Sequence, residues 1–256
     1  MKSLSVAIDG RFIPGSDGGV ESVVVGLAQG FNGLENHGVK ISLVTYQGFN
    51  SWASRLDSLN VVEVPVLRER SRLLSRSRIW ALRCSAGSVS MLPKRDRQMD
   101  KIGADVVHMP FQGRGWVSSP YIYHPHDLQH RHLPEFFTKR QRAWREVVYG
   151  NHCKRATAVA VGTTWVKEDI ISQMGVPAGK IFVVPLAPID GGQSSATSSV
   201  ELKHVIPAKY LIYPAASWPH KNHARLFEAI AALRSTGTPV HLVITRVLPG
   251  LTWTSS

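Results

Sequence analysis

The chain has few cysteines, few acidic side chains and no long apolar run, and each shortage excludes a class of protein. Its 256 residues include only two cysteines, Cys84 and Cys153. They are too few for a disulfide framework and are not spaced like metal ligands. No stretch approaches the roughly 20 apolar residues of a membrane-spanning helix, and the N-terminal apolar stretch is too short for a signal peptide. We therefore expect a cytoplasmic protein with reduced thiols that meets a membrane only at its surface.

Acidic side chains are outnumbered by basic ones. There are 18 Asp and Glu against 30 Lys and Arg, which gives a net charge of +12. This charge favours anionic partners, namely phosphates, nucleic acid or an acidic membrane face. The hydrophobic content of 43% is ample for a core, and the length is that of one or two domains.

Short apolar strands alternate with amphipathic helices over most of the chain. Apolar residues recur at helical spacing in Val20–Leu34, for example, whereas the strands are short runs rich in Val and Ile. The predicted elements are strand Ser5–Asp9, helix Val20–Leu34, strands Lys40–Thr45 and Val61–Val66, the mostly helical Ser71–Lys101 broken at Pro93, strands Asp105–Met109 and Tyr121–His124, helix Phe137–Cys153, strand Thr157–Gly162, helix Thr164–Met174 and strand Lys180–Pro185. This alternation predicts an α/β fold, a doubly wound parallel sheet covered by helices on both faces.

A second, shorter unit is predicted after a linker. Residues 188–200 are small and polar, which is a linker composition. The alternation then restarts with strand Tyr210–Pro214, helix Asn222–Arg234 and strand Val240–Thr245. Two doubly wound units joined in this way place a ligand cleft between them. The predicted domains are 1–187, a linker 188–206, an incomplete domain 207–245 and a tail 246–256 without periodicity.

Paired glycines lie between the first predicted strand and the first predicted helix. Gly18 and Gly19 belong to the segment Gly15–Glu21. Glycines at this place allow a ligand to approach the backbone at a helix N-terminus. The alternative is a plain strand-to-helix turn, and the dinucleotide fingerprint G-x-G-x-x-G is absent.

Histidines crowd the segment that follows the predicted strand Tyr121–His124. The polar residues concerned are His124, His126, Asp127, His130 and His132. A metal site is one interpretation, but Pro125 stiffens the loop and no convincing later ligand set is present. A hydrogen-bonding histidine facing the cleft is the second, and His126 paired with Asp127 suits it best. Solvated loop histidines are the third, which fits His130 and His132. His108, at the end of the preceding strand, is expected to be a structural histidine bonded to backbone rather than a catalytic one.

Lys221 lies between a predicted strand and a predicted helix, in the segment Trp218–Asn222. A lysine and free backbone N–H groups at a helix start beside a strand end suit a diphosphate. Asn222 is expected to cap the helix, and Arg225, one turn further on, could assist Lys221. The alternative is an ordinary surface lysine.

Basic residues concentrate in residues 68–101, which hold ten Lys or Arg against three acids. Apolar side chains are interleaved with them, so the segment resembles a basic amphipathic surface for an anionic membrane. The contacts we expect there are Arg72, Arg76, Arg78 and Trp80. The alternatives are a solvated helical face and a nucleic-acid patch. The latter is disfavoured because no aromatic-and-basic strand platform is evident.

Taken together and in order, several of these stretches resemble the glycosyltransferase family 4 enzymes. The stretches are Asp9–Arg11 with Gly18–Glu21, Asp105–His108, His126–Leu128 with Pro134–Phe137, Gly175–Val176 with Lys180–Pro185, and Pro219–His223. The resemblance implies a GT-B fold of two facing domains and retaining transfer of a sugar from a nucleotide sugar. It is strongest to mannosyltransferase-like members that build bacterial cell-surface polysaccharide such as lipopolysaccharide.

The resemblance also implies roles for individual residues. His126, with Asp127, would contact the transferred sugar near its anomeric carbon. Lys221, with Arg225, would stabilise the leaving diphosphate, and the glycine loop would approach the phosphates or the acceptor. The donor would be a GDP- or UDP-linked hexose, mannose first. The acceptor would be lipid-linked glycan or polysaccharide at the inner face of the plasma membrane. Neither a metal nor another cofactor is required, since the cation and helix N-termini neutralise the leaving group.

Two departures from the family pattern affect the expected activity. The family often places an Arg a few residues before this Lys, where the chain has Ala215–Ser217. The family's donor domain carries paired glutamates, whereas after Asp190 the chain has only Glu201 and Glu228 as carboxylates. We therefore expect a truncated, impaired transferase, as a frameshift or premature stop near Thr245 would produce. The alternatives are a non-catalytic module that binds an acceptor or a membrane surface, and, ranked last, a nucleic-acid binder.

Overall fold

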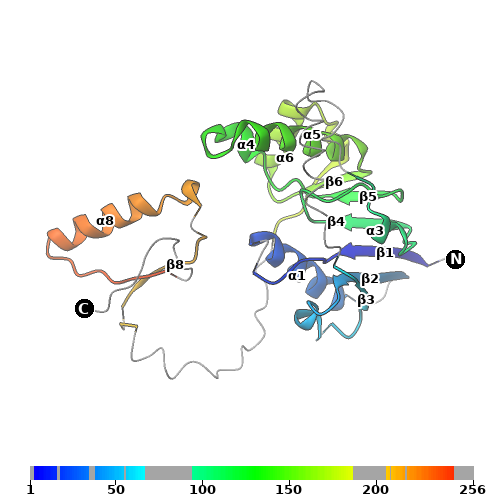
Figure 1. Cartoon of the computed structure of the whole chain (residues 1–256), viewed down its shortest axis with the longest axis horizontal. Helices are drawn as coiled ribbons and strands as arrows, with labels where there is room; N and C mark the ends of the chain where they lie inside the picture. Colours follow the sequence, from blue (N-terminus) through cyan, green and yellow to red (C-terminus); the bar gives the residue numbers. More distant parts are fainter. Residues whose placement is uncertain are drawn as a thin grey trace, which may run out of the picture. The chain divides into compact units, whose positions relative to one another are not determined.

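The structure is a computed structural model that describes residues 3–15, 18–34, 38–54, 56–66, 94–186, 206–207, 209–216 and 218–244. The chain divides into two compact units, Met1–Asp190 and Gly191–Ser256 (Figure 1). Three predicted features lie outside the described residues. They are most of the basic segment, with Arg72, Arg76, Arg78 and Trp80, most of the linker, and the tail. Residues 94–101 of the basic segment are described.

The first unit is built on a seven-stranded sheet in which every pairing is parallel. The strands are β1 Leu4–Asp9, β2 Val39–Tyr46, β3 Asn60–Val64, β4 Val106–Met109, β5 Tyr121–Tyr123, β6 Ala158–Val161 and β7 Ile181–Val183. They lie in the order β3-β2-β1-β4-β5-β6-β7, which confirms the predicted doubly wound α/β fold. The order reverses between β1 and β4. Open α/β sheets bind ligands at the carboxyl ends of the strands beside such a reversal.

Helices and short 3-10 turns connect these strands. The helices are α1 Gly19–Asn32, α3 Arg97–Asp100, α4 Gln129–His132, α5 Lys139–Arg155 and α6 Thr164–Met174, and the turns are η1 Ser51–Ala53, η2 Pro134–Phe136 and η3 Ala178–Lys180. Local capping explains their ends. Thr138 and Gln141 form a capping box at the start of α5, and Gly175 ends α6 in the left-handed conformation. Figure 1 shows α4, α5 and α6 grouped near β5 and β6.

Apolar side chains pack on both faces of the sheet. Neighbouring residues of a strand point to opposite faces, and Ala7 belongs to the larger core cluster whereas Ile8 belongs to a smaller one. The larger cluster includes the fully buried Tyr123 and Tyr149. Cys153 is also buried there as a free thiol, and burial raises its pKa to about 12. Burial on both faces explains why an inner strand such as β6, with the sequence Ala-Val-Ala-Val, is apolar throughout and does not alternate with polar residues.

The described part of the second unit is one strand–helix–strand motif. It consists of β8 Leu211–Tyr213, the turn η4 Pro219–Lys221, α8 His223–Ser235 and β9 Leu242–Ile244, and β8 pairs with β9 in parallel. This arrangement confirms that the α/β alternation restarts after the linker. Among the described residues of both units, no helix is both long and apolar enough to cross a membrane.

Candidate functional site

A buried ion cluster holds the chain that leaves β1 at the sheet reversal. The Arg11 guanidinium contacts both carboxylate oxygens of Asp9 at 2.8 Å each. It also contacts Asp96 at 2.5 and 3.1 Å. Burial alone would raise the pKa of Asp9, but Arg11 and Arg114 outweigh it and hold that pKa below its ordinary value. Arg11 is therefore fully engaged inside the protein, where it fixes the β1 loop.

Arg114 is the second cation of this cluster and comes from the loop after β4. Its guanidinium lies 4.2 Å from the centroid of the Phe111 ring. It donates hydrogen bonds to the Arg11 carbonyl and, at 3.4 Å, to the Tyr46 hydroxyl. These contacts join the loops after β1, β2 and β4. The sequence stretch Asp9–Arg11 signals part of this cluster, but nothing local indicates Arg114 or Asp96.

The start of α1 is open, as the paired glycines predict. Gly18 has φ 61° and caps the helix without a side-chain hydrogen bond, a conformation that favours glycine. A Cβ added at Gly18 or Gly19 would meet nothing within 4 Å. The Glu21 carboxylate turns back to accept the Gly15 N–H at 2.9 Å. The backbone at this helix start is thus accessible beside the carboxyl end of β1, so a ligand approach is sterically possible.

His126 lies just after the carboxyl end of β5 in a strained backbone conformation. Its φ is 63°, which is uncommon for a residue other than glycine. Its Nε2 lies 2.7 Å from the carbonyl oxygen of Pro110, at the end of β4. A carbonyl only accepts, so Nε2 carries the proton and Nδ1 is left as an acceptor. Burial lowers the pKa of His126, so the ring is neutral at pH 7.

Asp127 is not the hydrogen-bond partner of His126, which corrects the pairing expected from their adjacency. The N–H of Asp127 donates to the Pro125 carbonyl at 2.8 Å. Its carboxylate accepts the Gln129 N–H at 3.2 Å. The left-handed turn at His126 directs the two side chains to different partners. Asp127 therefore organises the turn into α4, and it acts on the imidazole only through its charge.

His108 and His124 form a buried imidazole pair next to His126. Their Nε2 atoms lie 2.7 Å apart, and the ring centroid of His124 lies 5.8 Å from that of His126. The backbone bond expected for His108 is therefore wrong for its Nε2, whose partner is another histidine. Burial lowers the pKa of His108 to about 4 and that of His124 to about 2. Both rings are neutral at pH 7, one donating and the other accepting.

His130 is not the solvated loop residue that the sequence favours, whereas His132 is exposed as expected, although it lies in a helix and not in a loop. His130 is buried, with its ring 5.3 Å from that of Tyr149 and its Nε2 3.1 Å from the Glu146 carboxylate. His132 bonds Asp169 at 2.8 Å. Both belong to α4, a short helix whose polar residues show no helical apolar spacing in the sequence. Within the described ranges, no group of three His, Cys, Asp or Glu side chains could hold a metal ion.

Lys221 and Arg225 lie in the second unit, after the carboxyl end of β8. Lys221 is exposed, and its carbonyl accepts a hydrogen bond from the Tyr213 hydroxyl at 2.7 Å. Asn222 has φ 54° and its side chain accepts the Arg225 N–H at 3.4 Å, which confirms the expected helix cap. The Arg225 guanidinium pairs with Glu228 at 2.9 Å on the exposed surface, an arrangement that water screens strongly. An anion could therefore compete for Arg225.

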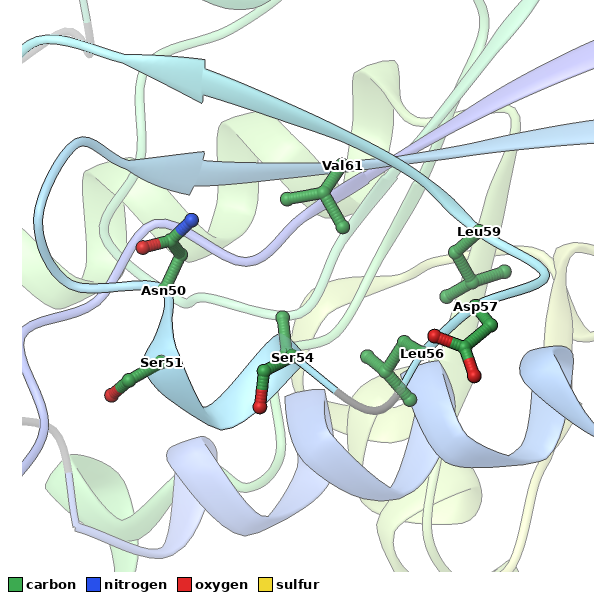
Figure 2. A pocket seen from close by; sticks show the side chains of 8 residues that line it. Asn50, Ser51, Ser54, Leu56, Asp57, Leu59 and Val61 are labelled. Carbon is green, nitrogen blue, oxygen red and sulfur yellow. The ribbon is translucent and has the colours of Figure 1, made fainter.

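A separate pocket of about 460 Å³ lies beside β3, the strand at one edge of the sheet. Figure 2 shows its lining side chains along the β2–β3 connection above a helix. The lining residues are Asn50, Ser51, Ala53, Ser54, Leu56, Asp57, Leu59 and Val61. It contains no predicted site residue and no basic side chain. The predicted residues of the first unit gather instead at the carboxyl ends of β1, β4 and β5.

A comparison with known protein families matches most of the first unit. Residues 18–187 match the model of a family described as glycosyl transferase 4-like domain, and no curated protein matches the chain. Three similar solved structures are a glycosyltransferase from Rickettsia africae (10% identity, TM-score 0.45), a putative UDP-N-acetylglucosamine 2-epimerase from Listeria monocytogenes (14%, 0.47) and a UDP-GlcNAc 2-epimerase from Neisseria meningitidis bound to UDP-GlcNAc (12%, 0.43).

These alignments cover 96%, 97% and 96% of this chain and 69%, 63% and 73% of the respective solved chains. The family model alone spans well over half of the chain and takes in α1, His126 and the strands from β2 to β7. This match confirms the resemblance: the chain belongs to the glycosyl transferase 4-like family.

Proposed function

We propose that this protein transfers a hexose, mannose first, from a GDP- or UDP-linked sugar to a lipid-linked or polysaccharide acceptor. The anomeric configuration would be retained, and the product would enter cell-surface polysaccharide such as lipopolysaccharide. The observation that carries the proposal is the position of His126 within the family-matched region, after β5 and bonded to the end of β4. Ligands of parallel α/β sheets bind at this edge.

The geometry of His126 supports a role in binding the transferred sugar. The Pro110 carbonyl occupies Nε2, so the neutral Nδ1 can accept a hydrogen bond from a sugar hydroxyl. The left-handed backbone at this residue is the kind of strain that functional sites retain. The packed His124 ring limits the rotation of the imidazole. In this proposal, His126 orients the sugar while its tautomer stays fixed.

The cationic helix start in the second unit is the proposed diphosphate site. Lys221 has its side chain exposed, and no ion pair found among the described residues involves it. The developing negative charge on the leaving diphosphate would be stabilised by Lys221 and assisted by Arg225. At Gly18 and Gly19, which have no side chain, the phosphates or the acceptor would lie directly against the backbone. Neither a metal nor another cofactor enters the proposal.

A transfer assay tests this proposal directly. The purified protein is incubated with radiolabelled GDP-mannose, and in parallel with UDP-hexoses, in the presence of a bacterial lipid extract and of EDTA. Labelled lipid or polysaccharide formed by the native protein, and lost in His126→Ala, would support it. The anomeric configuration of the product is read by NMR. If the folded protein transfers none of the sugars, the non-catalytic acceptor- or membrane-binding module becomes the better account.

A further inference from the structure

The turn that carries His126 is closed by one backbone hydrogen bond across a single residue. The N–H of Asp127 donates to the carbonyl of Pro125 at 2.8 Å, and His126 lies between them with φ 63°. This is the pattern of a classic γ-turn, which is rare and strained. A residue other than glycine keeps such a conformation only where the surrounding structure holds it there. Contacts from outside the turn are therefore needed to maintain it.

The side chain of Gln112, in the loop after β4, supplies such a contact. Its Nε2 donates a second hydrogen bond to the Pro125 carbonyl. Because a carbonyl only accepts, the amide nitrogen of Gln112 faces it and the amide oxygen does not. The Pro125 oxygen has two lone pairs, and the two donors, Asp127 and Gln112, use both of them. The Gln112 amide thus joins the loop after β4 to the turn after β5.

Gln112 is itself held in place through its backbone. The Tyr123 hydroxyl donates to the Gln112 carbonyl at 2.9 Å. Tyr123 is fully buried in β5, and burial raises the pKa of its hydroxyl well above the ordinary value, so this group keeps its proton. Two residues further on, the Arg114 carbonyl accepts from Nε2 of His152 in α5 at 3.0 Å. The loop is thus anchored on β5 and on α5, and the Gln112 side chain extends from a fixed backbone.

The loop after β4 therefore holds both the ring and the backbone of His126. Pro110 accepts the hydrogen bond of the imidazole Nε2 at 2.7 Å, and Gln112, two residues later, bonds the carbonyl that precedes His126. If the Gln112 bond were lost, the peptide between Pro125 and His126 could rotate and carry the ring away from the Pro110 carbonyl. The proton would then no longer be confined to Nε2, because the hydrogen bond of one ring nitrogen sets the tautomer.

We propose that Gln112 is a positioning residue for His126. By bonding the Pro125 carbonyl, it maintains the strained turn that keeps the proton on Nε2 and leaves Nδ1 as an acceptor. The inference rests on the proposed function, in which Nδ1 of His126 binds a hydroxyl of the transferred sugar. Gln112 acts on the sugar only through His126, because its amide is bonded to protein backbone. Removing this amide should misplace the imidazole without removing it.

NMR of the ring nitrogens tests this hold without any sugar nucleotide. The full chain is labelled with isotope-enriched histidine, and the His126 signals are those that disappear in His126→Ala. Gln112→Met keeps the side-chain length and removes the donor, so the Nε2 and Nδ1 shifts of His126 should move toward each other as the two tautomers interconvert. The matched control is Gln98→Met, because the Gln98 amide also donates to a proline carbonyl, that of Pro65 at 2.8 Å. It should leave the His126 signals unchanged.

A second variant removes the same donor in another way. Gln112→Glu has the same length, but a carboxylate only accepts at pH 7 and would repel the Pro125 carbonyl. It should move the His126 signals at least as far as Gln112→Met does. Gln112 is half-buried and lies outside the apolar core, so both variants should fold, which circular dichroism verifies.

Sugar transfer provides the functional readout. Gln112→Met should lower the transfer rate about 10-fold, the upper end of what one neutral hydrogen bond contributes. In combination with His126→Ala it should lower the rate no further, because a residue that acts through the imidazole has nothing to position once the imidazole is gone. An equal loss in both backgrounds would overturn the proposal, as would unchanged His126 signals in both Gln112 variants.

The two readouts separate this inference from the proposed function. Displaced His126 signals in the Gln112 variants of a protein that transfers no sugar would leave the hold of Gln112 on the ring standing and refute the proposed function. Sugar transfer by the native protein, with unchanged His126 signals in both variants, would do the reverse.

Discussion

Replacing Asp9 by Asn removes one carboxylate charge from the buried cluster that fixes the β1 loop. The Nε and Nη2 atoms of Arg11 would lose their charged partner Asp9. Nη2 would still donate to the Asp96 carboxylate. Arg114, 3.5 Å from Asp9, would lose its nearby negative charge as well. Arg11 would keep only the partly exposed Asp96 as its ionic partner, and Arg114 would be left without the one carboxylate with which it forms an ion pair among the described residues.

The expected cost follows from the burial of the pair. Breaking a buried ion pair by removing one partner costs about 3–5 kcal/mol, because an uncompensated charge stays behind. The remaining contacts with Asp96 place Asp9→Asn near the lower value, about 3 kcal/mol. For a chain of this size each kcal/mol lowers Tm by about 2–4 °C. The variant should therefore melt roughly 6–12 °C below the native protein.

Thermal unfolding followed by circular dichroism at pH 7 measures this difference. Asp57→Asn is the matched control, because it removes the same charge from an exposed carboxylate and should leave Tm within about 1 °C. A double variant, Asp9→Asn with Arg11→Met, should lose less stability than the sum of its single variants, because the charges are removed together. If Asp9→Asn melted no lower than Asp57→Asn, the claim that this cluster holds the β1 loop would be wrong.

Three further predictions concern the candidate site. His126→Ala should reduce the rate of sugar transfer about 100- to 1000-fold, as removal of one positioned hydrogen-bonding group does in other enzymes. The control variant His132→Ala should change this rate much less. Equal losses of steady-state rate in the two variants would contradict the role assigned to His126. Lys221→Ala should weaken nucleotide-sugar binding roughly 10- to 100-fold through the loss of a charged hydrogen bond, and Lys221→Arg should restore part of it; calorimetric titration that finds native affinity in both would exclude this lysine. In the folded protein, burial lowers the pKa of His108 to about 4 and that of His124 to about 2, whereas both are near 6.5 in the unfolded chain. The unfolded chain therefore binds more protons as the pH falls through 6.5, so the stability of the folded protein should decline from pH 7 to 5. In His124→Phe the decline in Tm over this range should be shallower, and an identical slope would refute the assignment.

Local patterns predicted the regular elements of this protein well. Helix α6 has the bounds expected from sequence, because Thr163 caps its start and Gly175 ends it. The strands on both sides of it, β6 and β7, also lie where expected, with bounds that differ by one or two residues. These signals are carried by neighbouring residues, so they are readable without knowledge of the rest of the chain.

Helix α4 shows where local patterns fail. Its four residues, Gln129–His132, are polar and show no helical apolar spacing, so they were expected to be a solvated loop. The helix exists because His130 packs beneath α5 against Tyr149 and His132 reaches Asp169 of α6. These partners lie 19 and 37 positions away, and only the packed structure brings them close.

The sequence by itself determined the order of strands and helices, the parallel sheet and the family, because short-range periodicity and ordered motifs encode them. Only the tertiary structure decided which partners the polar groups take. His126 bonds the Pro110 carbonyl instead of its neighbour Asp127, and Arg11 reaches Asp96 across 85 positions. The physical reason is that burial makes an unpaired polar group costly. Each such group therefore bonds the partner that the fold places within about 3 Å, however distant that partner is in the chain.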